Sequence, residues 1–401
     1  MLTQQRFEAL WRSLHAIGRD PISGGYLRSS WTPADQAMRE WFTEEATDRD
    51  LTVETDGNGN LWAWWGDPTA GDAVLTGSHL DSVPHGGAYD GPLGIVSAFL
   101  AIDLLRDRGC APRRPVGVVA FAEEEGSRFG LACLGSRLLT GALDPARARG
   151  LVDARGIPLA QAVVEAGLDP EALGADPARL ARVGAFVELH IEQGRALGDH
   201  PVGVASAIWP HGRWRLEFAG EGNHAGTTLM ADRRDPMLTF AYTVLAANKE
   251  ARLAGAHATV GRASVEPNAT NAIPARVHAW LDARAADQST LDELVEAVRR
   301  RAHDRAERDG TAVTLTPESV TPEVRFDATL RDRLASLLAA PVIPTGAGHD
   351  AGVLAAAGVP TAMLFVRNPT GVSHSPAEHA TDADCATGVE ALARVLQDLA
   401  C

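Results

Sequence analysis

Residues 77–94 read GSHLDSVPHGGAYDGPLG, and this stretch organises the interpretation of the whole chain. A run of apolar and β-branched residues at 73–76 precedes it, and a helix-like run at 95–105 follows it. The stretch is therefore a strand-to-helix junction, where doubly wound α/β proteins place their chemistry. Its possible metal ligands are His79, Asp81 and Asp90. Imidazole and carboxylate groups on a glycine-rich loop suit a borderline divalent metal.

The composition is typical of a soluble globular protein. The chain has 401 residues, of which 45% are hydrophobic and 22% are charged, so two domains are expected. A formal net charge of −15 argues against nucleic acid as a partner, because phosphate binding needs basic patches. Residues 1–14 resemble an amphipathic helix, and neither a secretory signal nor an apolar run of membrane length is recognisable. No membrane partner is therefore expected.

The positions of the cysteines predict neither a disulfide framework nor a metal site. The four cysteines are Cys110, Cys133, Cys385 and Cys401, and none of them has CxxC spacing. Neither a disulfide framework nor a thiolate zinc site is expected from such scattered positions. A cytoplasmic enzyme or binding protein agrees best with these features.

Strands alternate with helices over the first half of the chain, which predicts a largely parallel sheet with helices on both faces. A hairpin is predicted over 51–65, around Asp-Gly-Asn-Gly-Asn. The continuous apolar run at 115–121 predicts a buried strand that ends in EEEG. Another strand is predicted over 184–189 and ends in HIEQG.

The pattern changes after about Ser206. Strands are expected over 209–218, 258–265, 275–283 and 312–316, and helices over 236–253 and 289–308. The order β-α-β-β-α-β is the ferredoxin-like signature. We therefore expect an inserted domain at 206–317 within an α/β domain formed by 1–205 and 318–401. The last strand of the α/β domain, 361–366, leads toward His374.

Four predicted strand ends carry side chains that can bind metal. They are His79 with Asp90, Glu124 with Glu125, His190, and His374. The carboxyl ends of parallel strands share one edge of a sheet, so these groups can converge. Two imidazoles and one carboxylate per ion suit Zn²⁺ or Mn²⁺, and one carboxylate can bridge two ions about 3.5–4 Å apart. Because neighbouring residues point different ways along an extended backbone, one of Glu124 and Glu125 can bind metal while the other acts as a base.

Six segments resemble the hydantoinase/carbamoylase branch of the di-metal M20 amidohydrolases. In chain order they are GSHLDSVPHGGAYDGPLG, EEEGSRF, ELHIEQG, GNHAGTT, TGAGHDA and SHSPAE. That branch includes N-carbamoyl-L-amino acid hydrolases, β-ureidopropionases and allantoate amidohydrolases. The resemblance implies a di-metal peptidase-like α/β fold with a mixed, mostly parallel sheet. It also implies that the inserted ferredoxin-like α+β domain is a lid and dimerisation domain in a homodimer.

The resemblance also implies the metal ligands and the catalytic groups. The ligands would be His79 and His190 for one ion, Glu125 and His374 for the other, and Asp90 as the bridge. Asp81 would orient His79, and Glu124 would be the general base. Two ions per subunit are expected, Mn²⁺ or Zn²⁺, with Co²⁺ or Ni²⁺ also possible, since such sites accept several metals.

Further residues resemble substrate-binding residues of the family. His224 in GNHAG and Asn271 in NATNAIP resemble lid residues that hold the oxygen that becomes negative in the transition state. Arg284 resembles the residue that holds the substrate carboxylate, and Gln193 resembles another substrate contact. In relatives the lid His or Asn reaches the active site of the neighbouring subunit. His85, His349 and Asp350 lie in family motifs, but no ligand role is assigned to them, and His349-Asp350 is expected to shape the pocket.

The implied activity is hydrolysis of the carbamoyl (ureido) C–N bond of a small substrate that carries a carboxylate, with release of ammonia and CO₂. Glu124 would take a proton from a water molecule acidified by the two cations and return it to the leaving nitrogen. Allantoate and N-carbamoyl-L-amino acids remain equal alternatives, because both offer a ureido group and a carboxylate. An N-formyl or N-acyl amino-acid hydrolase, a dipeptidase, and a metal-dependent binding protein without catalysis also remain open.

Overall fold

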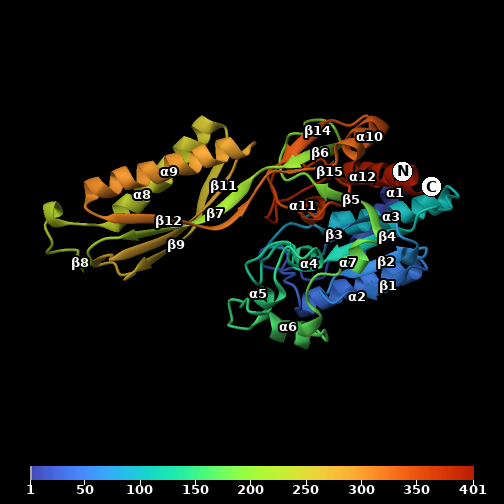
Figure 1. Ribbon diagram of the computed structural model, residues 1–401, viewed down its shortest axis with the longest axis horizontal. Helices are drawn as coiled ribbons and strands as arrows, with labels where there is room; N and C mark the ends of the chain where they lie inside the picture. Colours follow the sequence, from blue (N-terminus) through green and yellow to red (C-terminus); the bar gives the residue numbers. More distant parts are fainter. Residues whose placement is uncertain (1) are drawn as a thin grey trace. The chain divides into compact units, whose positions relative to one another are not determined.

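The computed structural model describes residues 2–401, which form two compact units (Figure 1). Unit 1 contains the chain up to Ala207 together with Arg325–Cys401, and unit 2 contains Ile208–Val324. Each unit has a hydrophobic core of its own. No helix within the described residues is long and apolar enough to cross a membrane. The cytoplasmic location expected from the sequence stays a prediction.

Unit 1 is built on a nine-stranded sheet with four parallel strands at its centre. In spatial order these strands are β4 (Val116–Phe121), β3 (Ala73–His79), β5 (Val183–Ile191) and β15 (Thr361–Val366). The predicted hairpin, β1 (Thr52–Thr55) and β2 (Leu61–Trp65), joins antiparallel beside β4. Beyond β15 follow β6 (Val202–Ile208), β13 (Val324–Arg325) and β14 (Val342–Thr345). The prediction of a mostly parallel central sheet is confirmed.

Two of these outer strands differ from the sequence-based expectation. The sequence pattern predicts a strand neither over 202–208 nor over 342–345. The segment of β6 reads VGVASAI, whose small residues have weak β propensity, so its pairing with β15 decides its conformation. The segment of β14 contains Pro344, which weakens a strand signal and is tolerated at a sheet edge.

Helices cover both faces of this sheet, and the alternation along β5 separates the faces. Val187, Leu189 and Ile191 join the hydrophobic core that contains α1 (Leu2–Leu14), α3 (Pro92–Asp107) and α12 (Asp382–Ala400). Glu188 and His190 point to the opposite face, where α4 (Leu134–Leu139) packs against α11 (Asp350–Ala356). The other helices of unit 1 are α2 (Pro33–Asp48), α5 (Pro145–Arg149), α6 (Leu159–Glu165), α7 (Pro177–Leu180) and α10 (Ala328–Leu338).

A disulfide joins Cys110 to Cys401, which corrects the expectation that no cysteines pair. The two residues are 291 positions apart, and their Cα atoms lie 6.1 Å apart, within the usual range for a disulfide. Cys110 follows α3 and Cys401 follows α12, and these helices pack together. Because helix packing alone creates this proximity, the spacing of the cysteines in the sequence could not reveal it. Cys133 and Cys385 are free and buried.

Unit 2 has the element order β-α-β-β-α-β and an antiparallel sheet in the order β12-β7-β11-β9. Its main elements are β7 (His211–Ala219), α8 (Pro236–Ala254), β9 (His257–Glu266), β11 (Arg276–Arg284), α9 (Gln288–Asp309) and β12 (Ala312–Thr321). Helices α8 and α9 lie on one side of the sheet (Figure 1), where Leu216 and Phe218 of β7 are buried. Strand β12 continues past the predicted 312–316, so unit 2 extends to Val324. A short pair, β8 (Asn223–His224) with β10 (Ala272–Ile273), completes it.

Candidate metal centre

The candidate site lies where the carboxyl ends of the four parallel strands meet. His79 is the last residue of β3, and His190 lies one residue before the end of β5. Asp90 precedes α3, whose N-cap is Gly91. Glu124-Glu125 follow β4, and His374 follows β15. The sheet therefore brings together residues that are up to 295 positions apart in the chain.

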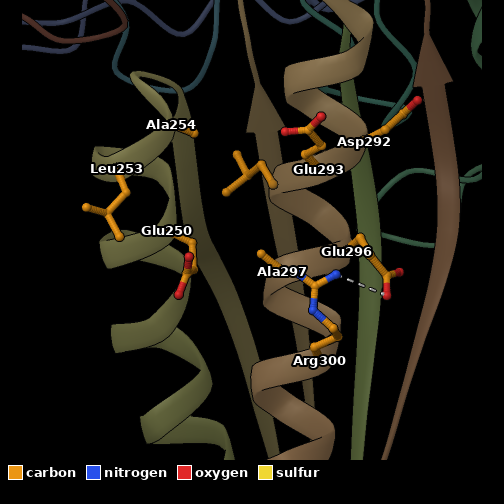
Figure 2. Close-up of a pocket in the computed structure, with 9 residues that line it drawn as sticks. Glu250, Leu253, Ala254, Asp292, Glu293, Glu296, Ala297 and Arg300 are labelled. Atoms are coloured by element: carbon orange, nitrogen blue, oxygen red, sulfur yellow. Dashed lines mark ion pairs between the residues drawn. The ribbon is translucent and has the colours of Figure 1, made fainter.

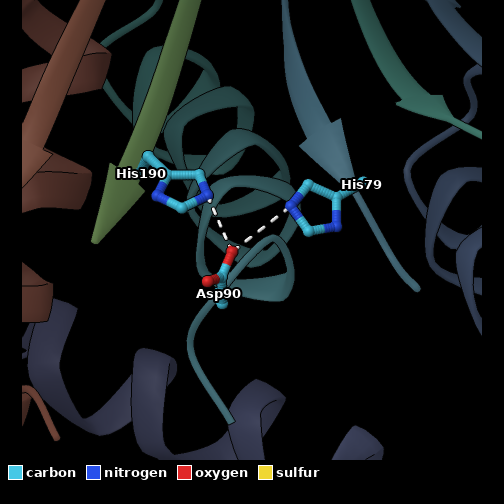
Figure 3. Close-up of side chains that lie close together, drawn as sticks. All are labelled: His79, Asp90 and His190. Carbon is cyan, nitrogen blue, oxygen red and sulfur yellow. Dashed lines mark ion pairs between the residues drawn. The ribbon is translucent and has the colours of Figure 1, made fainter. Parts of the chain in front are cut away.

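Asp90 lies at the centre of this site (Figure 3). Its Oδ1 is 3.4 Å from His79 Nε2 and 3.1 Å from His190 Nε2. Its Oδ2 is 3.3 Å from His374 Nε2, and Glu125 Oε2 is 3.5 Å from the same nitrogen. One oxygen of Asp90 therefore faces two imidazoles, and the other faces a third imidazole beside a second carboxylate.

These distances fit two groups of metal ligands. Two ligand atoms about 2.1 Å from one ion are separated by roughly 3.0–3.4 Å in tetrahedral or octahedral coordination. His79, Asp90 and His190 form one compact group, and Asp90, Glu125 and His374 form another. Within residues 2–401, the buried His79 Nε2, His190 Nε2 and Glu125 Oε1 lack a hydrogen-bond partner. Because an unpaired buried polar atom costs about 1–3 kcal/mol, such atoms are expected where a ligand completes them.

Backbone carbonyls orient both buried imidazoles. His79 Nδ1 lies 3.1 Å from the carbonyl oxygen of Asp81, and His190 Nδ1 lies 2.9 Å from that of Ile191. A carbonyl only accepts hydrogen bonds, so each Nδ1 carries a proton. In the neutral imidazole this leaves the lone pair on Nε2, the atom that faces Asp90. This is the tautomer that a metal requires.

Asp81 connects the ends of two strands. Its Oδ1 lies 3.5 Å from His79 Nδ1, so the carbonyl of Asp81 is closer to this imidazole than its carboxylate is. The carboxylate oxygens accept hydrogen bonds from the backbone N–H groups of Glu124 and Glu125, at 3.2 and 3.1 Å. Asp81 therefore positions the Glu124-Glu125 segment as well as His79.

The backbone is strained at this site. Gly91 has a φ of 84°, and a Cβ at that position would lie 2.5 Å from two ring atoms of His79. Glu123 and His374 adopt φ values of 53° and 54°, which are uncommon for residues other than glycine. Such conformations persist only where the surroundings impose them, and they concentrate at functional sites.

Glu124 and Glu125 lie on different sides of the site. Glu125 faces His374, whereas Glu124 Oε2 lies 3.7 Å from His79 Nε2. The thiol of Cys133 donates to Glu124 Oε1 at 3.3 Å. Burial raises the pKa of Glu124 well above its usual value, although the nearby His79 opposes this shift. A buried carboxyl that takes up a proton readily has the property required of a general base that later returns the proton.

The imidazoles and carboxylates shift one another's pKa values in opposite directions. Burial would raise the pKa of Asp90, but His190, His374 and His79 outweigh it and hold that pKa well below its usual value. The hydrogen bond to Asp90 raises the pKa of His374 to about 9. Burial and the charge of Asp90 raise the pKa of Glu125 to about 7. The site therefore concentrates negative charge that a cation would neutralise.

The residues predicted to bind substrate fall into three places. In unit 1, Gln193 Nε2 donates to Asp90 Oδ2 at 2.8 Å, within the candidate metal centre. In unit 2, Ala225 N donates to the carbonyl of Asn271 at 3.0 Å, so His224 and Asn271 are neighbours, and both are exposed. Arg284 ends β11 and donates to both carboxylate oxygens of Asp282, at 2.9 and 3.2 Å.

Arg284 does not lie beside the His224–Asn271 pair. Strand β11 begins at Arg276, close to the β8–β10 pair, and ends at Arg284. At roughly 3.3 Å per residue these two positions are about 26 Å apart. One molecule of a small substrate cannot contact both ends of this strand.

The buried acidic residues near the site that have no predicted role include Glu188 and Glu378, and Asp350, which is expected only to shape the pocket, is buried as well. Glu188 accepts hydrogen bonds from Ser78 Oγ at 2.8 Å and from Ala351 N at 3.1 Å. Asp350 accepts from Ser136 Oγ at 2.5 Å. Glu188 could have been found from the sequence, because it precedes His190 by two residues in a strand and so shares its face.

His349 also lies at this edge, where it was expected to shape the pocket. Its ring centroid is 4.5 Å from that of His190, and its Nε2 is buried without a partner among residues 2–401. Burial and the neighbouring His190 lower the pKa of His349 well below its usual value. The imidazole is therefore neutral at physiological pH. Glu188, His190 and His349 form a third compact group of possible ligand atoms.

A groove of about 700 Å³ between α8 and α9 of unit 2 has a different character (Figure 2). Its lining residues are Glu250, Leu253, Ala254, Asp292, Glu293, Leu294, Glu296, Ala297 and Arg300. None of them is a histidine or a cysteine, and Glu296 pairs with Arg300 at 3.6 Å. Among residues 2–401, the clusters of side chains that could hold a metal ion all lie in unit 1.

Comparison with known proteins gives one family. The chain matches the model of peptidase family M20/M25/M40 over residues 75–398. It is 38% identical to N-carbamoyl-L-amino acid amidohydrolase of Geobacillus stearothermophilus, with 98% of each chain covered. It is 33% identical to allantoate amidohydrolase of Escherichia coli K12, over 99% of this chain and 98% of that relative. A solved amidase of the hydantoinase/carbamoylase family from Burkholderia vietnamiensis superposes with a TM-score of 0.88 at 30% identity, over 99% and 97% of the two chains.

Metal affinity is expected to rise with pH between about 6 and about 9, because a cation must displace protons from its ligands. In the metal-free protein Glu125, with a pKa of about 7, and His374, with a pKa of about 9, hold protons at and below neutral pH. Lowering the pH through these values therefore weakens binding. Calorimetric titration with Mn²⁺ in buffers of different ionisation enthalpy measures the protons released. Binding at neutral pH without proton release would contradict this account.

Proposed function

The chain belongs to peptidase family M20/M25/M40, and from this membership we propose that it is a metal-dependent amidohydrolase that acts on ureido compounds. It cleaves the carbamoyl C–N bond of a small substrate with a carboxylate, such as allantoate or an N-carbamoyl-L-amino acid, and releases ammonia and CO₂. The names of two relatives that match over nearly the whole chain support this substrate class. The observation that carries the proposal is the position of Asp90, whose two oxygens face two different groups of ligands.

Two divalent ions fit this arrangement. His79 and His190 would hold one ion, Glu125 and His374 would hold the other, and Asp90 would be shared between the two groups. Mn²⁺ or Zn²⁺ suits such donors, and Co²⁺ or Ni²⁺ is also compatible. When bound, the ions acidify a water molecule and polarise the carbonyl group of the substrate.

Glu124 is the general base. Its Oε1 contacts the Cys133 thiol, and its Oε2 is directed toward His79. Glu124 takes a proton from the attacking water as the ureido carbonyl carbon becomes tetrahedral. It then returns this proton to the nitrogen that leaves, since proton transfer by a positioned group speeds such a step by about 10²–10⁴-fold. Asp81 holds the backbone of Glu124 in place through Glu124 N.

Four further residues bind the substrate. His224 and Asn271 donate to the oxygen that becomes negative, and such preorganised donors act most strongly in the transition state. Arg284 binds the substrate carboxylate, and Asp282 orients its guanidinium. Gln193 contacts the substrate from beside Asp90.

The separation of these residues supports a homodimer in which unit 2 is a lid and dimerisation domain. His224 and Asn271 lie at one end of the unit 2 sheet, and Arg284 lies at the other end of β11, about 26 Å away. In a symmetric dimer the two ends can serve different active sites. We propose that Arg284 acts in the site of its own chain and that His224 and Asn271 act in the site of the partner.

A substrate panel tests the proposed activity. Metal-reconstituted protein is incubated with allantoate and with N-carbamoyl, N-formyl and N-acetyl L-amino acids, while ammonia and free amino acid are followed. We expect ammonia release from allantoate or from an N-carbamoyl amino acid. Faster release of free amino acid from the N-formyl or N-acetyl compounds would indicate an acylase instead. Substrate affinity without any product would indicate a binding protein.

Replacing Glu124 with Gln is expected to lower kcat by at least about 100-fold, because the amide cannot take a proton from water. The metal content should stay that of the wild type, since Glu125 and not Glu124 contacts His374. Turnover rates and metal analysis of the purified variant check both parts. Glu165→Gln is the matched control, because Glu165 is exposed and lies outside the candidate site, where its carboxylate accepts a hydrogen bond from Gln161 Nε2 at 2.8 Å. Turnover of Glu124→Gln within tenfold of wild type would show that another group is the base.

Mixing two inactive variants tests the dimer. His224→Ala and Arg284→Ala are each expected to be nearly inactive alone. In a random mixture half of the dimers are heterodimers, and each has one site with both residues, so about a quarter of wild-type activity should return. If both residues acted in the site of their own chain, no site in the mixture would be complete, and activity would not return. Size-exclusion chromatography of the wild type confirms the dimer beforehand.

A further inference from the structure

Glu378 has no role in the mechanism above, yet its carboxylate contacts two loops of the candidate metal centre. Its Oε1 accepts hydrogen bonds from the backbone N–H groups of Tyr89 and Asp90, at 2.8 and 3.0 Å. Its Oε2 accepts from Ser373 Oγ at 3.0 Å. The residue is only 5% exposed, so these contacts are made away from bulk water.

The two loops carry ligands that must meet. One loop ends in Asp90 and the other contains His374, which follows Ser373 directly. Ser373 Oγ also lies 3.3 Å from Asp90 Oδ2, the oxygen that faces His374. Ser373 has one hydroxyl proton, so it donates to one of the two carboxylates at a time, and the contact with Glu378 is the shorter one. Glu378 therefore joins the backbone of Asp90 to the loop of His374, and Ser373 Oγ lies next to the side chain of Asp90.

Gly87 shows how closely the carboxylate fits. A Cβ at position 87 would lie 2.3 Å from Glu378 Oε1 and 2.4 Å from its carboxyl carbon. The loop can therefore approach Glu378 only because residue 87 has no side chain. This crowding also means that an alanine there would push the carboxylate aside without removing it.

We infer that Glu378 is a positioning residue for the metal centre. It holds the loops of Asp90 and His374 at the separation at which Asp90 Oδ2 and His374 Nε2 lie 3.3 Å apart. A buried carboxylate suits this purpose, because its two oxygens accept several hydrogen bonds from fixed directions. The inference rests on the metal ligands proposed above, and it concerns metal binding rather than the choice of substrate.

Metal affinity measured without substrate tests this inference. Wild type, Glu378→Ala, Glu378→Gln and Gly87→Ala are compared by chelator competition with Mn²⁺ and by the absorption spectrum of the Co²⁺-loaded protein. Outer groups that orient ligands typically change metal affinity by about 10–100-fold, so a loss of this size is expected for Glu378→Ala. Gly87→Ala should weaken binding in the same way. Glu378→Gln should restore most of the affinity, because its amide oxygen can still accept from both backbone N–H groups.

A residue with only a structural role should give a different combination of thermal stability and metal affinity. Asp56→Asn is the matched control, because Asp56 is also a buried carboxylate that accepts backbone N–H groups, at 2.9 Å from Asn58 and Asn60, but in the β1–β2 turn. Asp56→Asn should lower the thermal unfolding temperature and leave metal affinity and the Co²⁺ spectrum unchanged. If Glu378→Ala fails to fold, the metal affinity of Gly87→Ala decides whether Glu378 positions the metal ligands.

Two failures are distinguishable in this experiment. Wild-type affinity and an unchanged Co²⁺ spectrum in the folded Glu378→Ala and Gly87→Ala variants would overturn the role of Glu378. A wild-type protein that binds no divalent metal would instead overturn the metal centre and the proposed function.

Discussion

The buried carboxylate of Asp90, surrounded by three imidazoles, is the interaction on which the candidate site depends. A carboxylate in a protein interior is stable only when opposite charges or hydrogen-bond donors compensate it. Here His79 and His190 face one oxygen, and His374 faces the other. Burial first, and then repulsion by neighbouring carboxylates, raises the pKa values of Glu124 and Glu125. Cations bound among these ligands would relieve that repulsion.

The parallel centre of the sheet makes this concentration of charge possible. Alternate residues of β5 point into a hydrophobic core, while Glu188 and His190 point to the other face. The scaffold therefore holds polar groups rigidly at one edge and remains apolar behind it. Asp81 and Glu378 add a second constraint, because each accepts backbone N–H groups from a loop that carries catalytic or metal-binding residues. Through such contacts, side chains on loops are held in position as firmly as side chains on the strands.

In the proposed function, unit 2 supplies substrate-binding residues that the candidate metal centre lacks. The metal centre explains hydrolysis of an amide-like bond, but it does not distinguish one substrate from another. In the proposed function, discrimination would depend on donors such as Arg284 and Asn271, which would hold the groups at the two ends of a substrate. In the proposed dimer a complete site would need residues from two chains, because Arg284 ends β11 and Asn271 lies near the other end of that strand. In this proposal the two units therefore have different tasks, hydrolysis in unit 1 and the choice of substrate in unit 2.

The central strands, the helix after Asp90 and the motifs that carry possible ligands were predictable from the amino-acid pattern, because strand periodicity and glycine-rich junctions are local signals. Parallel strands share an edge, so the meeting of His79, Asp90, Glu124-Glu125, His190 and His374 also followed from the pattern, whereas the choice of Glu125 over Glu124 as a ligand came from the family resemblance. The pairing of Cys110 with Cys401, the strand β6, and the contacts of Asp81 and Glu378 became visible only in the folded chain. Each of these depends on packing between segments that are distant in the chain. The local sequence does not predict which distant segments will be in contact, because these contacts form only when the helices and strands pack together.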